Sequence, residues 1–166
     1  IPEDSMERRV KEEKLPYDKW HERGLVRLCR GNTINYKDVT AWFVEMANTY
    51  GIFPAWVYYD RWSAAYWVEE MKETGFTEMK GVAQGAKTLS LPMQFLGADL
   101  QAKRINYNNN PILRWCLSNT GVQEDRNGNI VPVKNQAAKQ RIDGTASLLN
   151  AYVGLYEHYN EFLEAQ

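Results

Sequence analysis

A wholly apolar run, AWVYY at residues 55–59, ends directly on the carboxylate of Asp60. A strand without polar alternation is typical of a sheet that is covered on both faces, as parallel sheets are. A helical period follows at once, with Ser63 as its expected N-cap and Gly75 as its end. The residues expected to face inward on that helix are Ala64, Trp67, Val68 and Met71. A buried strand followed by an amphipathic helix predicts the first half of a strand–helix–strand unit.

The same alternation continues along the chain. Residues 77–83 (TEMKGVA) predict a second strand, and Ser90 with Pro92 predicts the start of a helix that runs to about residue 103. The Asn-Gly pair at 127–128 indicates a hairpin between strands at Val122 and Ile130. We therefore expect an α/β fold in which parallel strands and the hairpin form one mixed sheet flanked by helices.

Helical periods and their boundary residues predict the remaining elements. These are a charged helix at 4–14, a short helix closed by Gly24, a strand at 25–29, a helix capped by Asn35, a short helix from Pro111 and a long helix at 141–163.

Charge and cysteine content exclude several classes of protein. The 166 residues carry a net charge of −1, so any DNA-binding face must be local and not a global basic field. Cys29 and Cys116 lack the spacing of a metal or disulfide framework, and two thiols suit a reducing cytoplasm. The sequence shows no apolar run of transmembrane length and no signal peptide.

Three familiar kinds of site are not indicated. The glycine-rich stretch GVAQGAKT at 81–88 has three residues between its glycines and an alanine before its lysine, whereas a phosphate-binding loop needs four residues and a lysine directly after the second glycine. His21 and His158 have no partner at metal-ligand spacing, and we expect both in solvent. The Gly-x-Ser-x-Gly pattern of serine hydrolases does not occur in the sequence.

Two aspartates occupy positions that suit metal ligands. Asp60 follows a predicted buried strand, and the carboxyl ends of such strands are where open α/β sheets bind their ligands. Asp143 lies in KQRIDGTASLLNAY, at the predicted start of the last helix. Each also has a structural interpretation, because Asp60 could begin a turn and Asp143 could cap its helix. Together, two carboxylates on rigid elements suit hard metal ions, as in a two-metal phosphodiesterase.

Five stretches carry a resemblance to a known family: LPYDKWHERGLVRLCRGNTINY, VYYDRWSA, QGAKTLSLPMQFL, NPILRWCLSN and KQRIDGTASLLNAY. In this order and spacing they resemble the C-terminal nuclease domain of the terminase large subunit of tailed bacteriophages and prophages. The resemblance covers nearly the whole chain and implies that residues 1–166 form one ribonuclease H-like nuclease domain. It further implies an endonuclease that cuts double-stranded DNA during genome packaging in the cytoplasm of the bacterial host. A small terminase subunit and a portal protein are the implied partners.

The resemblance also implies a metal site and its ligands. Asp60 and Asp143 match the family's second and last metal-binding carboxylates, which hold two Mg²⁺ or Mn²⁺ ions. Since such ions lie about 3.5–4 Å apart, we expect the two carboxylates within about 8 Å of each other. The side chains that could contact DNA phosphates, or could equally be solvated surface charges, are Lys87, Arg104, Arg114, Lys134 and Lys139.

One ligand and one domain of the family are not matched by this sequence. The resemblance implies that the family's ATPase domain, and the first strand or strands of the sheet with the first metal-binding aspartate, precede the segment that begins here at Ile1. Asp99 is the nearest replacement for that aspartate. We therefore expect these 166 residues alone to bind metal weakly, to cut DNA slowly or not at all, and to self-associate through an unpaired sheet edge. The alternative function is that of a catalytically incomplete DNA-binding or motor-assembly module.

Overall fold

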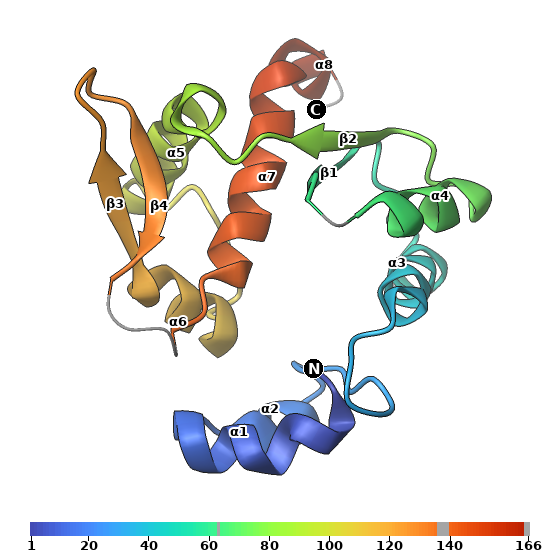
Figure 1. The fold of residues 1–166 in the computed structure, drawn as a ribbon. Helices are drawn as coiled ribbons and strands as arrows, with labels where there is room; N and C mark the ends of the chain where they lie inside the picture. The colour runs from blue at the N-terminus through green and yellow to red at the C-terminus, as the bar shows by residue number, and fades with distance from the viewer. Residues whose placement is uncertain (63, 136–139, 165–166) are drawn as a thin grey trace.

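The computed structural model describes residues 1–62, 64–135 and 140–164, and it contains a strand–helix–strand unit (Figure 1). β1 (Val57–Asp60) pairs in parallel with β2 (Met79–Val82), and α4 (Ala65–Glu73) lies between them in the chain. In this register Asp60 lies opposite Val82. The predicted parallel strands are confirmed, and Asp60 is the last residue of its strand. Ser63, the expected cap of the helix, lies outside the described residues.

The predicted hairpin is present, but it forms a sheet of its own. β3 (Thr120–Glu124) pairs antiparallel with β4 (Ile130–Lys134), and in the described part of the chain neither strand pairs with β1 or β2. The expectation of one mixed sheet is therefore wrong. The reason is that α5 (Ala86–Gln101) and α7 (Asp143–Glu157) lie between the two sheets (Figure 1). The hairpin is covered by α5, which β4 contacts directly.

Helical segments at the N-terminus lie apart from both sheets (Figure 1). The elements here are η1 (Glu3–Ser5), α1 (Met6–Glu13) and α2 (Tyr17–Glu22). The next helix, α3 (Tyr36–Tyr50), packs on α4 beside the parallel strands. The prediction of a strand at 25–29 is wrong, because this segment forms only an isolated bridge, between Pro2 and Cys29. Its backbone meets the first residues of the chain, with the Cys29 N–H donating to the Ile1 carbonyl at 2.9 Å.

Two helices contain proline, and only one of them begins where the sequence predicted. α6 (Pro111–Asn119) starts at its proline, and the Asn110 side chain caps it by accepting from the amides of the first turn. α5 begins instead at Ala86, so Pro92 lies inside the helix. The proline therefore does not mark the helix start, because the preceding residues already have helical geometry.

A histidine divides the predicted long C-terminal helix. α7 ends at His158, and α8 (Tyr159–Glu164) follows. We expected both histidines in solvent, and His21 is exposed. His158 is not, because its ring stacks on Trp56 with 3.9 Å between centroids.

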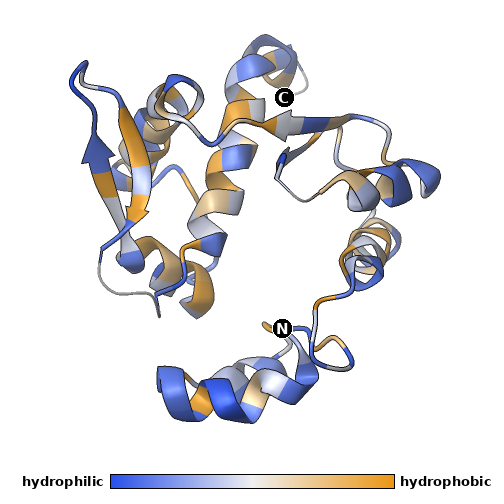
Figure 2. Cartoon of the chain, viewed as in Figure 1, coloured by the Kyte–Doolittle hydropathy of each residue, from blue (hydrophilic) through white to orange (hydrophobic). Residues whose placement is uncertain are grey.

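Apolar side chains gather in two clusters, one on each side of β1. Figure 2 shows hydrophobic and hydrophilic residues alternating along α7. Val57 and Tyr59 contribute to the cluster under α3 and α4, and Tyr58 contributes to the cluster under α5 and α7. Successive residues of β1 thus face opposite clusters, which confirms that this strand is covered on both faces. The predicted inward residues of α4 are all buried: Ala64, Trp67, Val68 and Met71.

Within the described residues, none of the helices is both long enough and apolar enough to cross a membrane.

Candidate functional site

Asp60 ends β1 with its side chain exposed to solvent. One carboxylate oxygen, Oδ1, accepts a hydrogen bond from the Trp62 backbone N–H at 3.0 Å. This contact is the local turn that was the structural interpretation of Asp60. It engages one of the two carboxylate oxygens, so it is compatible with a second role as an oxygen ligand.

Asp143 is the first residue of α7, and its side chain is exposed. The N-cap position belongs to Ile142, and no side-chain hydrogen bond caps the helix. The interpretation of Asp143 as an N-cap is therefore wrong. Its charge lies at the positive end of the helix without being bound to the helix amides.

Contacts with α6 and β3 fix the first turn of α7. The Asn119 side-chain amide donates to the Arg141 carbonyl at 3.0 Å, and the hydroxyls of Thr120 and Thr145 lie 2.9 Å apart. A Cβ on Gly144 would lie 3.2 Å from the sulfur of Cys116, so any larger residue there would require α6 to give way by a few tenths of an ångström. The backbone that carries Asp143 is thus held on a rigid support.

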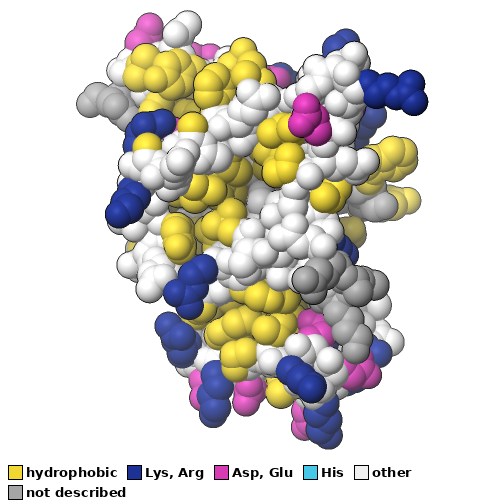
Figure 3. Space-filling view, turned by 90° about the vertical axis from the view of Figure 1, so that its left-hand side faces the viewer, with side chains coloured by type: hydrophobic (Ala, Val, Ile, Leu, Met, Phe, Trp, Pro, Cys, Tyr) yellow, Lys and Arg dark blue, Asp and Glu magenta, His cyan; other side chains and the backbone are white. Residues whose placement is uncertain are grey.

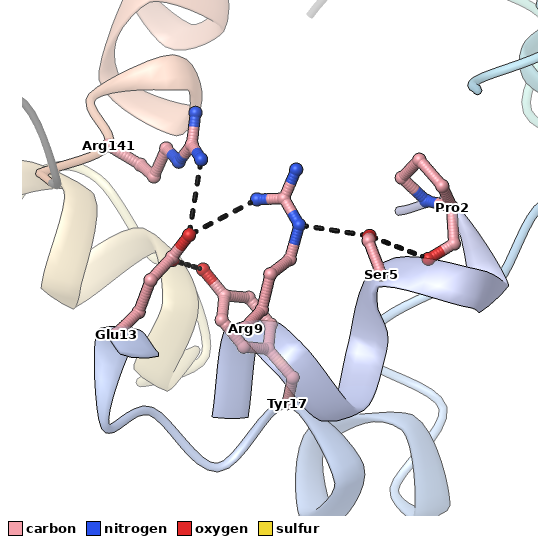
Figure 4. Close-up of polar contacts among 6 residues, drawn as sticks. All are labelled: Pro2, Ser5, Arg9, Glu13, Tyr17 and Arg141. Atoms are coloured by element: carbon pink, nitrogen blue, oxygen red, sulfur yellow. Dashed lines mark hydrogen bonds and ion pairs between the residues drawn. The ribbon is translucent and has the colours of Figure 1, made fainter. Parts of the chain in front are cut away.

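A buried ion-pair network joins the N-terminal helices to this same segment (Figure 4). Glu13, whose side chain is 9% exposed, pairs with Arg141 at 3.2 Å and with Arg9 at 3.4 Å. Its other oxygen accepts from the Tyr17 hydroxyl at 2.6 Å. Burial raises the pKa of Glu13, but the hydrogen bonds from Tyr17 and Arg141 outweigh it, and the pKa is lowered overall. Glu13 is therefore ionised and bound to Arg141.

A cavity of about 570 Å³ opens between the N-terminal segment and α6–α7. Asp143 and Asp38 lie on its wall together with the guanidinium groups of Arg9, Arg27 and Arg141. Most of the remaining wall is apolar, including Tyr17, Ile34, Val39, Trp42, Ile112 and Trp115. Charged groups beside apolar walls interact more strongly than they would in bulk water. Asp143 therefore borders a concave space with three arginines nearby, which the sequence did not single out.

The two aspartates expected as metal ligands can be compared with the donors that a divalent ion needs. Asp60 and Asp143 are exposed carboxylates, the hard oxygen donors that Mg²⁺ and Mn²⁺ prefer. Across residues 1–62, 64–135 and 140–164, however, no group of three or more His, Cys, Asp or Glu side chains is placed to hold a metal ion. The donor chemistry fits a divalent ion, and the number of donors is low.

Asp99 does not have the character of a replacement ligand. Its carboxylate accepts from the Tyr152 hydroxyl at 2.8 Å and from Arg104 Nε at 2.7 Å. These hydrogen bonds, with that from Tyr152 the larger influence, lower the pKa of Asp99. The residue thus ties α5 to α7.

The basic residues singled out in the sequence do not form one patch. Lys87, Arg114 and Lys134 are exposed on different elements, and Arg104 is exposed but paired with Asp99. Lys139 lies outside the described residues. On the face that Figure 3 shows, lysine and arginine side chains are spread among neutral and apolar ones. Arg9, Arg27 and Arg141 line the same cavity as Asp143, and none of the described basic residues singled out in the sequence does.

Comparison with known proteins places the chain among terminases. Residues 1–158 match the family described as terminase large subunit, endonuclease domain. The chain is 26% identical over 148 residues to the terminase large subunit of Enterobacteria phage HK97, covering 89% of this chain and 29% of that protein. It is 36% identical over 72 residues to protein YmfN of Escherichia coli strain K12, covering 42% of this chain and 16% of that protein.

A comparison with solved structures also finds a terminase. The crystal structure of the HK97 bacteriophage large terminase matches with a TM-score of 0.83 at 25% identity, covering 93% of this chain and 32% of that one. The chain thus spans a third or less of the length of these relatives. The match over residues 1–158 shows that this chain belongs to the family of terminase large subunit endonuclease domains.

Proposed function

We propose that this chain is a metal-dependent DNA endonuclease domain that hydrolyses phosphodiester bonds during phage genome packaging. The observation that carries the proposal is the family match over residues 1–158. Asp60 and Asp143, one at a strand end and one at a helix start, are the residues that would hold Mg²⁺ or Mn²⁺. When bound, two such ions polarise the scissile phosphate and activate a water molecule.

The chain's own residues have three tasks in this proposal. Asp60 and Asp143, with their carboxylates expected within about 8 Å of each other, would supply oxygen ligands to a shared pair of ions. Asn119 and Thr120 keep the first turn of α7 in place, so that Asp143 does not have to be ordered when metal binds. Exposed basic side chains contact DNA phosphates without reading sequence, so binding should weaken steeply with salt. The proposed contacts are Lys87, Arg104, Arg114, Lys134 and Lys139.

We extend the proposal to the fold and to the partners. The parallel pair β1–β2, with α3–α4 on one face and α5–α7 on the other, supports a ribonuclease H-like arrangement. Double-stranded DNA is the proposed substrate, in the cytoplasm of the bacterial host. A small terminase subunit and a portal protein are the proposed partners.

A second candidate function is a DNA-binding or motor-assembly module that does not cut. The low number of metal donors among the described residues favours it. For the same reason we propose that the 166 residues alone bind metal weakly and cut slowly or not at all, because Mg²⁺ dehydrates reluctantly at sparse sites.

Plasmid nicking separates the two functions. The full-length protein and the 166-residue polypeptide are incubated with supercoiled DNA in Mg²⁺ and in Mn²⁺. We expect nicking by the full-length protein, lost in Asp60→Ala and in Asp143→Asn, and retained in Asp4→Asn, a control at an exposed aspartate of η1. DNA binding without metal-dependent nicking would favour the second function. Robust nicking that survives both substitutions would show that other carboxylates form the site.

A further inference from the structure

Arg141 lies two residues before Asp143, and both residues line the same cavity. In the described structure Arg141 pairs with Glu13 and not with Asp143. Only its Nη2 is engaged with Glu13, and its buried Nε has no acceptor among the described residues. A guanidinium carries five N–H donors, so this one has donors left for a second carboxylate. An arginine with unused donors beside Asp143 would compete with a metal ion for the oxygens of that carboxylate.

Glu13 is placed to prevent that competition. Its carboxylate is almost fully buried, and the Tyr17 hydroxyl and Arg9 hold it from α1 and α2. Burial strengthens the attraction between Glu13 and Arg141, because water screens it less. The Arg141 carbonyl is held separately by Asn119, so the side chain can change partner without moving the backbone.

We propose that Glu13 is a positioning residue for the metal site: by binding Arg141 it keeps the Asp143 carboxylate open to metal. This inference rests on the proposed function. When Glu13 is neutralised, the Arg141 guanidinium is free to turn toward Asp143 and occupy the oxygens that a metal ion would take. The N-terminal helices would thus act on the site without contacting metal or DNA.

A double-mutant cycle read out by Mn²⁺ binding tests the inference. Free Mn²⁺ is measured by electron paramagnetic resonance in the full-length protein, with Asp143→Asn as the baseline for this site. We expect Glu13→Gln to weaken Mn²⁺ binding about tenfold, as loss of a group supporting a metal ligand does. We expect Arg141→Gln to bind at least as well as wild type. The double variant should bind like Arg141→Gln, because the competing group is gone.

Glu22→Gln is the matched control, because it neutralises the carboxylate of an exposed ion pair with Lys19 in α2 and leaves the Glu13–Arg141 pair in place. We expect it to bind Mn²⁺ like wild type. If Glu13→Gln does not fold, Glu13→Asp keeps the charge but retracts it from Arg141, and the same rescue by Arg141→Gln is expected.

The outcomes separate this inference from the proposed function. If Glu13→Gln weakens Mn²⁺ binding equally in the wild type and in the Arg141→Gln variant, the inference is overturned. Glu13 would then act through its own charge or through the fold. Loss of binding in Asp143→Asn but not in Glu13→Gln would overturn the role of Glu13 alone. Equal binding by wild type and Asp143→Asn would overturn the metal site, and the positioning role with it.

Discussion

At the scale of single residues, Asp143 is subject to two effects of similar size and opposite sign. A negative charge at a helix N-terminus contributes about 0.3–1 kcal/mol, and repulsion from Asp60 at the proposed separation of about 8 Å would cost about 0.5 kcal/mol in water. We therefore expect Asp143→Asn to change the metal-free stability by less than about 0.5 kcal/mol. Excess Mn²⁺ should raise the melting temperature of the wild type and not of the variant. Equal increases in the melting temperature of both proteins would show that Asp143 does not bind the metal.

The positions of the two aspartates, at a strand end and at a helix start, could be predicted from sequence because each follows from a local pattern. Asp60 comes directly after an apolar run, and Asp143 begins a helical period. The contact between Glu13 and Arg141 could not be predicted, because 128 residues separate them. Glu13 lies in a charged segment with the pattern of a solvated surface, and only the tertiary structure shows that it is buried.

At the scale of elements, two helical glycines form a matched pair with opposite predictions. A Cβ on Gly154 of α7 would lie 2.7 Å from the Tyr58 ring of β1, whereas a Cβ on Gly97 of α5 would meet nothing within 4 Å. We expect Gly154→Ala to destabilise the fold by about 1–3 kcal/mol through overpacking. Gly97→Ala should stabilise it by about 0.5–1 kcal/mol through helix propensity. Urea denaturation measures both, and a stabilised Gly154→Ala would contradict the close packing of α7 on β1.

Glu157, at the end of α7, binds both parallel strands. It accepts from the Tyr58 hydroxyl at 2.5 Å and pairs with Lys80. These hydrogen bonds, with that from Lys80 the larger, lower the pKa of Glu157 from its usual 4.5. Because the folded-state pKa is depressed, the stabilisation is present above about pH 4.5 and is lost as the pH falls through the folded-state value.

The stability difference between wild type and Glu157→Gln should therefore shrink between about pH 6 and about pH 3. Urea melts at each pH measure it. High salt should also reduce the difference at the higher pH, because the pair is partly exposed. A difference independent of both pH and salt would assign the effect to packing.

The elements that could be predicted are those fixed by local pattern. The unit β1–α4–β2 follows from an apolar run, a helical period and a second strand signal, and the Asn-Gly pair marks the hairpin turn. The position of the hairpin outside the parallel sheet depends on α5 packing against β4, which no local pattern encodes. The break at His158 depends likewise on its stacking with Trp56, which lies far away in the sequence.

At the scale of the whole molecule, the parallel sheet has an edge that invites association. β1 pairs with β2, and along the other edge of β1 no described strand is paired. Unpaired strand edges recruit strands from other chains. We expect the 166-residue polypeptide to self-associate, with a weight-average mass that rises with concentration in sedimentation velocity. Val122→Lys on the hairpin, where Val122 is 60% exposed, is the control. Its association should be unchanged, and loss of association would assign the contact to the hairpin instead.

Because α1 and α2 lie apart from both sheets, they can open without the rest of the protein. Their connections to the body include the Glu13–Arg141 pair and the Trp20–Trp115 ring contact at 6.1 Å. Segments with few buried contacts exchange amide hydrogens through local unfolding at low free energy. We expect deuterium to enter the amides of α1 and α2 well before those of α7. Each such opening would release Arg141 while α7 stays folded, so the rate of this local unfolding would set how often the two charged partners separate.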